Sequence, residues 1–190
     1  MKTIPITRDI PTRIETPRLL IRCPEPGDGA AVFAGVVASL ESLRQFPASL
    51  PWSVFEPSVD ESERYCREGH AKYLLRTEMP MLLFSKADDV YIGGSGLHSF
   101  DWSVPKCEIG YWLRSGYTKQ GLAAEAVGAI TAFAFSNLGM RRVEALPDDE
   151  NLASCKVCER AGYSLEGVLR NDRAEPNGRL RNTRVYAITQ

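Results

Sequence analysis

The sequence lacks the apolar runs that mark membrane-spanning or exported proteins. None of its segments approaches the roughly 20 consecutive apolar residues that span a bilayer, and no apolar core of a signal peptide follows Met1. The formal net charge of −1 gives no electrostatic basis for general nucleic-acid binding. These absences predict a cytoplasmic protein that binds neither membrane nor nucleic acid directly.

Cysteine and histidine are too scattered for a disulfide framework or a metal centre. The five cysteines are an odd number and lie far apart in the chain. Cys155 and Cys158 have C-x-x-C spacing, but no second pair accompanies them, and neither His70 nor His98 stands at a ligand spacing. Small buried cysteines are common in helices. We therefore predict no metal site.

The composition is that of an ordinary globular protein. Hydrophobic residues make up 44% of the chain and charged residues 25%. A length of 190 residues is enough for one domain with a substantial core. We predict a single domain over residues 1–190, in which about the first twelve residues form an N-terminal extension.

The order of hydrophobic patterns predicts a mixed α/β sheet with helices on both faces. Apolar patterning and turn residues delimit about six to seven strands, which we place at residues 13–23, 81–85, 90–100, 107–113, 142–146, 163–169 and 184–188. Helical patterns cover residues 29–43, 58–76, 121–138 and 151–161. The adjacent strands over 90–113 form an antiparallel hairpin closed by residues 101–105.

Residues 117–126 have the pattern of an anion site. They follow a strand and begin the helix over 121–138, and Gly121 lets a ligand approach the backbone. The first N–H groups of a helix have no internal partners, and the helix dipole is positive there, so a phosphate fits. The sequence contains neither G-x-x-x-x-G-K-S/T nor G-x-G-x-x-G. Because many helices begin with small residues, spacing alone leaves a plain helix start as the alternative.

Four segments in order resemble the GNAT superfamily of acyl-CoA-dependent N-acyltransferases. They are residues 15–22, 108–113, 118–126, and 151–154 followed by 159–163. The closest resemblance is to the RimJ/RimL-like branch, which includes N-terminal protein acetyltransferases. It covers residues 13–188, nearly the whole chain, and implies a single GNAT-like domain with a mostly antiparallel sheet.

The resemblance implies acetyl-CoA as cofactor and coenzyme A as product. The backbone of Trp112 and Leu113 would hold the pantetheine arm. Asn151 would bond the amides of the arm, although asparagine at this position is also a good helix N-cap. The pyrophosphate would lie on the backbone N–H groups of the loop and first helical turn, which come from Gln120, Gly121, Leu122, Ala123 and Ala124.

The loop departs from the family pattern at its first position. The family usually has Arg or Gln where this chain has Thr118, which is shorter and uncharged. A side-chain contact to phosphate is therefore in doubt here. Lys119 and Gln120 are candidates to replace it, and the backbone N–H groups remain.

The implied reaction is direct acyl transfer from a thioester to a neutral amine. An α-amine has a pKa near 7.7–8.0 and needs only a weak base. Glu108 is the candidate base by position, and if residues 101–105 close the hairpin symmetrically, His98 lies opposite it. Ser154 is the candidate donor to the departing thiolate. Alternatively, Glu108 is a half-exposed strand carboxylate and Ser154 a hydroxyl of the capping region.

The acceptor side is predicted from the proline-rich loop over 47–57 and its neighbours. Trp52 and Tyr111 are the candidate substrate-binding residues, although loop aromatics can equally fold back as a lid on the core. Nearby carboxylates could attract a cationic amine or be simply solvated; they are Glu61, Glu63, Glu68 and Glu78.

The sequence thus predicts an acetyl-CoA-dependent N-acetyltransferase acting on a protein or peptide α-amine. One alternative is the same chemistry on a small amine such as an amino acid, a polyamine or an antibiotic. The other is an acyl-CoA-binding module without turnover. A monomer and a homodimer both remain open.

Overall fold

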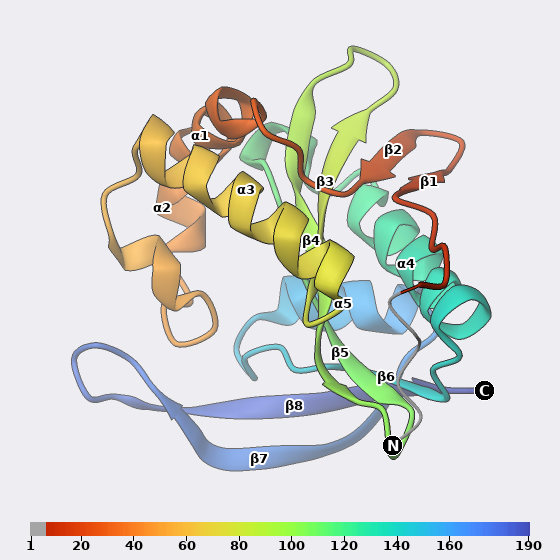
Figure 1. Cartoon of the computed structure of the whole chain (residues 1–190). Coiled ribbons are helices and arrows are strands. Elements are labelled where there is room, and N and C mark those ends of the chain that lie inside the picture. Colours follow the sequence, from red (N-terminus) through yellow and green to blue (C-terminus); the bar gives the residue numbers. More distant parts are fainter. Residues whose placement is uncertain (1–6) are drawn as a thin grey trace.

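A single sheet of eight strands runs through residues 7–190, the part of the chain that the computed structural model describes. The strand order is β1-β2-β3-β4-β5-β6-β8-β7, and every neighbouring pair is antiparallel except β5 with β6 (Figure 1). This confirms the predicted mixed and mostly antiparallel sheet. The N-terminal extension predicted over about 1–12 lies partly outside the described residues.

The helices and strands follow the predicted order. The strands are β1 (Arg13–Glu15), β2 (Leu19–Arg22), β3 (Met79–Ser85), β4 (Tyr91–Asp101), β5 (Lys106–Leu113), β6 (Arg142–Ala145), β7 (Ser164–Ala174) and β8 (Leu180–Thr189). The helices are α1 (Gly29–Val37), α2 (Leu40–Leu43), α3 (Val59–Leu75), α4 (Leu122–Leu138) and α5 (Leu152–Arg160), with 3-10 turns η1 (Pro51–Val54) and η2 (Ser115–Tyr117).

The sheet has eight strands rather than six to seven because the first predicted strand is divided. Pro17 lies in a turn between β1 and β2, and the Leu19 N–H donates to Thr16 Oγ1 at 2.9 Å there. The predicted helix over 29–43 is likewise divided, at Ala38 and Ser39, into α1 and α2. The final hairpin of β7 and β8 is longer than its hydrophobic pattern predicted.

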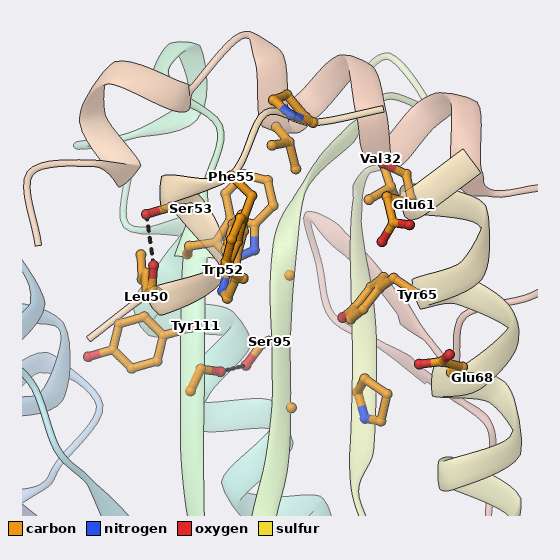
Figure 2. Close-up of a pocket in the computed structure, with 18 of the residues that line it drawn as sticks. Val32, Leu50, Trp52, Ser53, Phe55, Glu61, Tyr65, Glu68, Ser95 and Tyr111 are labelled. Atoms are coloured by element: carbon orange, nitrogen blue, oxygen red, sulfur yellow. Dashed lines mark hydrogen bonds between the residues drawn. The ribbon is translucent and has the colours of Figure 1, made fainter. Parts of the chain in front are cut away.

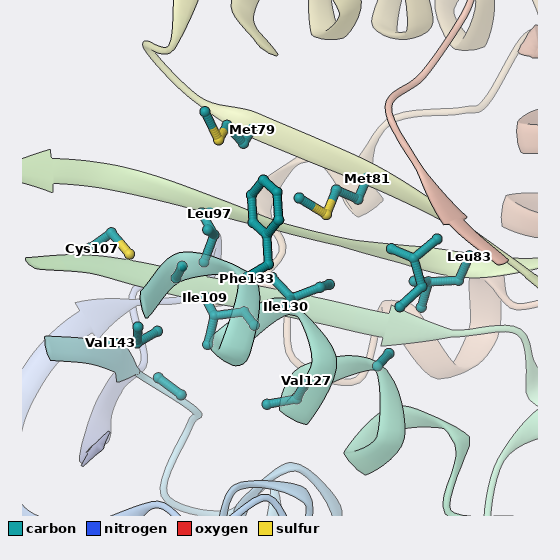
Figure 3. Close-up of a cluster of buried hydrophobic side chains, with 14 of the residues drawn as sticks. Met79, Met81, Leu83, Leu97, Cys107, Ile109, Val127, Ile130, Phe133 and Val143 are labelled. Carbon is teal, nitrogen blue, oxygen red and sulfur yellow. The ribbon is translucent and has the colours of Figure 1, made fainter. Parts of the chain in front are cut away.

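The two faces of the sheet are covered by different helices. Helix α4 packs on one face, where Val127, Ile130 and Phe133 meet Met81 and Leu83 of β3 in the main core (Figure 3). Helices α1 and α3 cover the other face (Figure 1). Burying each such large side chain contributes about 1.5–3 kcal/mol. This packing fixes the N-terminus of α4 relative to the end of β5.

Strands β5 and β6 separate along their length. They pair in parallel only from Lys106 opposite Arg142 to Glu108 opposite Glu144. From Ile109 to Leu113, β4 is the only strand of the described chain that pairs with β5. One backbone edge of β5 therefore faces a gap, which begins directly after Glu108. None of the helices within residues 7–190 combines the length and apolar character needed to cross a membrane.

Candidate active site

Two cavities meet at strand β5. The sheet cleft has a volume of about 940 Å³ and lies between η1, α3 and the face of β4 and β5; its walls include Val32, Trp52, Phe55, Tyr65 and Trp112. The splay cavity has a volume of about 160 Å³ and lies where β5 leaves β6; its walls include Glu108, Pro147, Asn151, Ser154 and Arg173. Both cavities are lined by Ser49, Leu50, His98, Gly110 and Tyr111. They are therefore adjoining parts of one site.

Three glycines form the floor of the sheet cleft. Gly94 pairs with Trp112, and Gly96 pairs with Gly110. Because alternate residues of a strand point to the same face, these positions face the cleft together. Glycine has no side chain, so this part of the sheet is bare between Trp112 at one end and Glu108 at the other. The glycine-rich sequence of β4 thus makes room for a ligand.

His98 and Glu108 lie opposite each other at the end of the glycine floor that is farther from Trp112. The predicted cross-strand pairing is confirmed, since the register places His98 directly against Glu108. His98 Nδ1 lies 3.8 Å from Glu108 Oε2 and 3.1 Å from Ser99 Oγ. The first distance is too long for a hydrogen bond. Both side chains therefore keep hydrogen-bonding capacity towards a ligand at the start of the gap.

A backbone irregularity follows His98 directly. The β4–β5 register shifts between His98 and Asp101, and Ser99 has a φ of 52°. Bulges of this kind re-aim side chains and are frequent next to active sites. No pattern in the sequence predicted this bulge.

Two hydroxyl groups meet at the splay cavity, one from Ser154 in the first turn of α5 and one from Tyr111 of β5. Asn151 Oδ1 accepts from the Ser154 N–H at 3.0 Å, so Asn151 is the N-cap of α5. This was one of the two roles predicted for it. Ser154 Oγ donates to Tyr111 Oη at 3.0 Å, and Tyr111 Oη donates to the Ser154 carbonyl oxygen. Burial and the neighbouring Cys158 raise the pKa of Tyr111 well above its usual value. Tyr111 therefore stays a neutral hydroxyl.

Tyr111 reaches α5 rather than the floor of the sheet cleft. It alternates with Gly110 and Trp112 along β5, so its ring leaves the strand on the other face. Its hydroxyl is 3.1 Å from Cys158 Sγ. Cys155 and Cys158 are both buried free thiols, and no cluster of residues suited to a metal ion is found within residues 7–190.

The loop before α4 has the geometry of an anion site. Gly121 is the N-cap of α4 with a φ of 79°, a left-handed conformation that favours glycine. Thr118 Oγ1 donates to the Ser115 carbonyl, and Gln120 Nε2 donates to the Gly116 carbonyl. Both side chains therefore stabilise the loop by hydrogen bonds within it. The N–H groups of residues 121–124 find no acceptor within residues 7–190. This set of free donors fits a phosphate group.

Arg18 and Glu125 hold this loop, and the sequence analysis did not identify either of them. Arg18 Nη1 donates to the Gln120 carbonyl at 2.9 Å, and its Nε donates to Glu125 Oε2 at 2.6 Å. Burial opposes the charged form of Glu125, but hydrogen bonds from Thr16 and Arg18 leave its pKa below the usual value. Arg18 belongs to the segment 15–22 that carried the resemblance, yet its contact spans 107 positions. No local pattern could reveal it.

Trp52 forms a wall of the sheet cleft. Its ring centroid lies 6.1 Å from that of Trp112, and the side chain is 42% exposed. Figure 2 shows Trp52 and Phe55 on one side of the cleft, with Tyr65 reaching in from α3 on the other. Of the two predicted arrangements, the loop thus borders the cleft and packs on Trp112 instead of closing over the main core.

The acidic residues near the cleft are paired with cations. Arg64 forms ion pairs with both Glu61 and Glu68, and Lys72 lies 3.0 Å from Glu78. Glu63 is paired with Arg67, accepts from the N–H groups of Gly27 and of Gly29 at the start of α1, and is not among the residues that line the cleft. The three of these carboxylates that line the cleft therefore share two cations, which leaves one uncompensated negative charge among them.

Comparison with known proteins identifies the family. The acetyltransferase (GNAT) domain model matches residues 18–164. The chain belongs to the GNAT acetyltransferase family. It is 25% identical to the uncharacterized N-acetyltransferase YoaA of Bacillus subtilis (strain 168) over 93% of this chain and 96% of that protein. It is also 30% identical to the ribosomal-protein-serine acetyltransferase of Escherichia coli (strain K12) over 64% of this chain and 67% of that protein.

Solved structures show the same GNAT fold. The ribosomal L7/L12 α-N-protein acetyltransferase RimL in complex with coenzyme A superposes with a TM-score of 0.83 at 20% identity, covering 95% of this chain and 97% of RimL. The microcin C7 self-immunity acetyltransferase MccE, in complex with acetyl-CoA and AMP, gives 0.84 at 18% identity, covering 95% and 97%. The chain is thus an acetyl-CoA-dependent N-acetyltransferase of the GNAT family.

Proposed function

We propose that this GNAT enzyme acetylates the α-amine of a protein or peptide. The observation that carries the proposal is the meeting of the two cavities at Gly110 and His98, beside Glu108. A thioester in the splay cavity and an amine in the sheet cleft would come together at this point. The similarity to a ribosomal-protein-serine acetyltransferase supports a peptide acceptor.

The free backbone groups at one end of the gap would hold the coenzyme. The N–H groups of residues 121–124 would bind its pyrophosphate, and Lys119 of the same loop would add a positive charge. The open edge of β5 at Trp112 and Leu113 would accept the pantetheine arm as an added strand. Asn151, besides capping α5, lines the splay cavity and would bond the amides of the arm there. Acetyl-CoA supplies an activated acetyl group as a thioester.

Glu108 would take up the proton that the amine must lose. An α-amine with a pKa near 7.7–8.0 is largely protonated at neutral pH, but only slightly stabilised in that form. A carboxylate acting directly or through one water is therefore a sufficient base. His98, 3.8 Å away, would orient Glu108 or the water between them. The amine nitrogen then forms the amide bond as the carbon–sulfur bond breaks.

Ser154 would stabilise the sulfur as it leaves. Its hydroxyl lines the splay cavity and is hydrogen-bonded to Tyr111. A thiol has a pKa near 8.5, so the departing thiolate needs a hydrogen bond or a proton for the step to be efficient. The two hydroxyls form a short chain that can supply it, while the raised pKa of Tyr111 keeps that residue protonated.

The proposal is tested by free-thiol release from acetyl-CoA with a panel of peptides and small amines. We expect release that depends on a peptide acceptor and that is about a hundredfold slower in Glu108→Gln at about pH 6.5, with coenzyme affinity unchanged. Glu166→Gln, which removes a strand carboxylate that lines neither cavity, is the matched control. Thiol release with small amines but with none of the peptides would contradict the peptide acceptor and indicate a small-molecule amine as substrate.

A further inference from the structure

We propose that the acceptor peptide carries a large apolar side chain, above all an aromatic one, at its first or second residue. This inference rests on the proposed function and concerns which N-termini the enzyme selects. The side chain would lie on the glycine floor of the sheet cleft and meet Trp52 and Trp112, while the α-amine reaches Glu108.

The size of the cleft is the first reason. At about 940 Å³ it is at the upper end of the range of about 300–1,000 Å³ in which small-molecule sites fall. A first residue such as serine or alanine would leave most of this space unfilled. A single polar amine would gain nothing from the apolar walls, whereas an aromatic side chain would exchange water for them.

The lining is the second reason. Trp112 is fixed by an edge contact with Tyr91, whose ring centroid is 6.0 Å away, and Trp52 lies on its other side at 6.1 Å. Tyr65 and Phe55 extend this surface across the cleft (Figure 2). Aromatic rings associate at centroid distances of about 4.5–7 Å. An acceptor ring would join an existing cluster.

The charge of the rim is the third reason. Most of the charge of the rim carboxylates is compensated: Glu61 and Glu68 share Arg64, and Glu78 is paired with Lys72. Glu56 is also paired, with Arg44 at 2.7 Å. The four carboxylates face three cations, so a polyamine or a strongly basic peptide would find one uncompensated negative charge at the rim. This favours recognition by apolar contact over recognition by charge.

The distance along the floor matches this placement. Trp112 is four residues beyond Glu108 on β5, which is about 14 Å at about 3.4 Å per residue. The ring of Trp112 fills part of the distance between Trp112 and Glu108. With the α-amine of the acceptor peptide at Glu108, a large side chain at the first or second residue of the peptide would fill the rest of that distance. An apolar residue further along the peptide would lie beyond the cleft.

The test compares kcat/KM for hexapeptides that differ only at the first two residues. Peptides beginning Trp-Ala and Ala-Trp should exceed Ser-Ala and Lys-Ala by about tenfold or more, because burying an aromatic side chain is worth at least that factor. In Trp52→Ala this preference should fall to within about threefold, with unchanged coenzyme affinity. The control is Trp102→Ala, whose ring stacks on Phe100 and lines neither cavity; it should keep the preference.

A second variant guards against a folding defect in Trp52→Ala. A Cβ on Gly110 would lie 3.4 Å from His98 Nε2, an ordinary contact. Gly110→Ala should therefore fold. Its methyl group would occupy space on the floor of the sheet cleft, so it should reduce the rate with Trp-Ala more than with Ser-Ala.

The outcomes separate the two proposals. Equal rates with Ser-Ala and both tryptophan peptides would overturn this inference and leave peptide acetylation standing. Tryptamine acetylated as efficiently as the tryptophan peptides would also overturn it, because the apolar group would then need no peptide. If none of the peptides were acetylated, the proposed function itself would fail.

Discussion

Breaking the contact between Arg18 and the loop before α4 should weaken coenzyme binding. Arg18 Nη1 holds the Gln120 carbonyl at 2.9 Å. In a trans peptide the carbonyl and the following N–H point in opposite directions. Fixing the Gln120 carbonyl therefore turns the Gly121 N–H away from Arg18 and towards the proposed phosphate position. Glu125, in the first turn of α4, holds the guanidinium in place.

The size of the effect follows from the exposure of the pair. A hydrogen bond from a charged group contributes about 1.5–3 kcal/mol when it is well shielded. The Arg18 side chain is 50% exposed and that of Glu125 is 18% exposed, and solvent reduces the contribution to about 1 kcal/mol. We therefore expect Arg18→Ala to weaken coenzyme A binding about fivefold.

Isothermal titration of coenzyme A into the purified variants measures this directly. Arg13→Ala is a suitable control, because Arg13 forms an exposed ion pair with Glu15 on β1 and touches no part of the loop. Its affinity should equal that of the native chain. If Arg18→Ala bound coenzyme A as tightly as the control, the loop would be held by other contacts and this argument would be wrong.

Two further variants test other parts of the site and the fold. Ser154→Ala should lower kcat about tenfold with unchanged coenzyme affinity, the Tyr111 hydroxyl limiting the loss; an unchanged rate at every pH tested would exclude the role. Asp148→Asn should destabilise the fold by about 3 kcal/mol in urea unfolding at neutral pH, because it leaves Arg181 buried with weaker partners. Burial opposes the charge on Asp148, but Arg181 leaves its pKa below the ordinary value. The native chain should therefore lose this stability as the pH falls below about 4 and through the lowered pKa of Asp148. Asp148→Asn should not show this loss. Equal acid sensitivity of the native chain and the variant would contradict the role of Asp148.

The hairpin of β4 and β5 was predictable because local turn residues indicate it, but its register was predictable only in part. Asp101 pairs with Lys106, and plain alternation from that pair would place Ser99 opposite Glu108; the bulge after His98 shifts the register and brings His98 to that position. The start of α4 at Gly121 was predictable for a similar reason, since a glycine between a strand and an apolar helical pattern has few other uses. These parts of the site lie within short segments.

The rest depends on contacts between segments far apart in the chain. The ion pair of Arg18 with Glu125 and the packing of Trp52 on Trp112 leave no local pattern. The break between α1 and α2 was missed because the apolar pattern continues through it. The glycines of β4 were visible, but their meaning as a cleft floor appears only when Gly110 is found facing them.

The pH dependence of acetyl transfer in Glu108→Gln tests the central claim most directly. Free-thiol release with a peptide acceptor is measured from about pH 6.5 to about pH 9 in the native chain, the variant and the Glu166→Gln control. If Glu108 is the base, the variant should be slower by about a hundredfold at the acid end. The deficit should shrink above about pH 8, where the α-amine is already neutral. Native rates in Glu108→Gln at the acid end, or a deficit that is the same at every pH, would contradict the account.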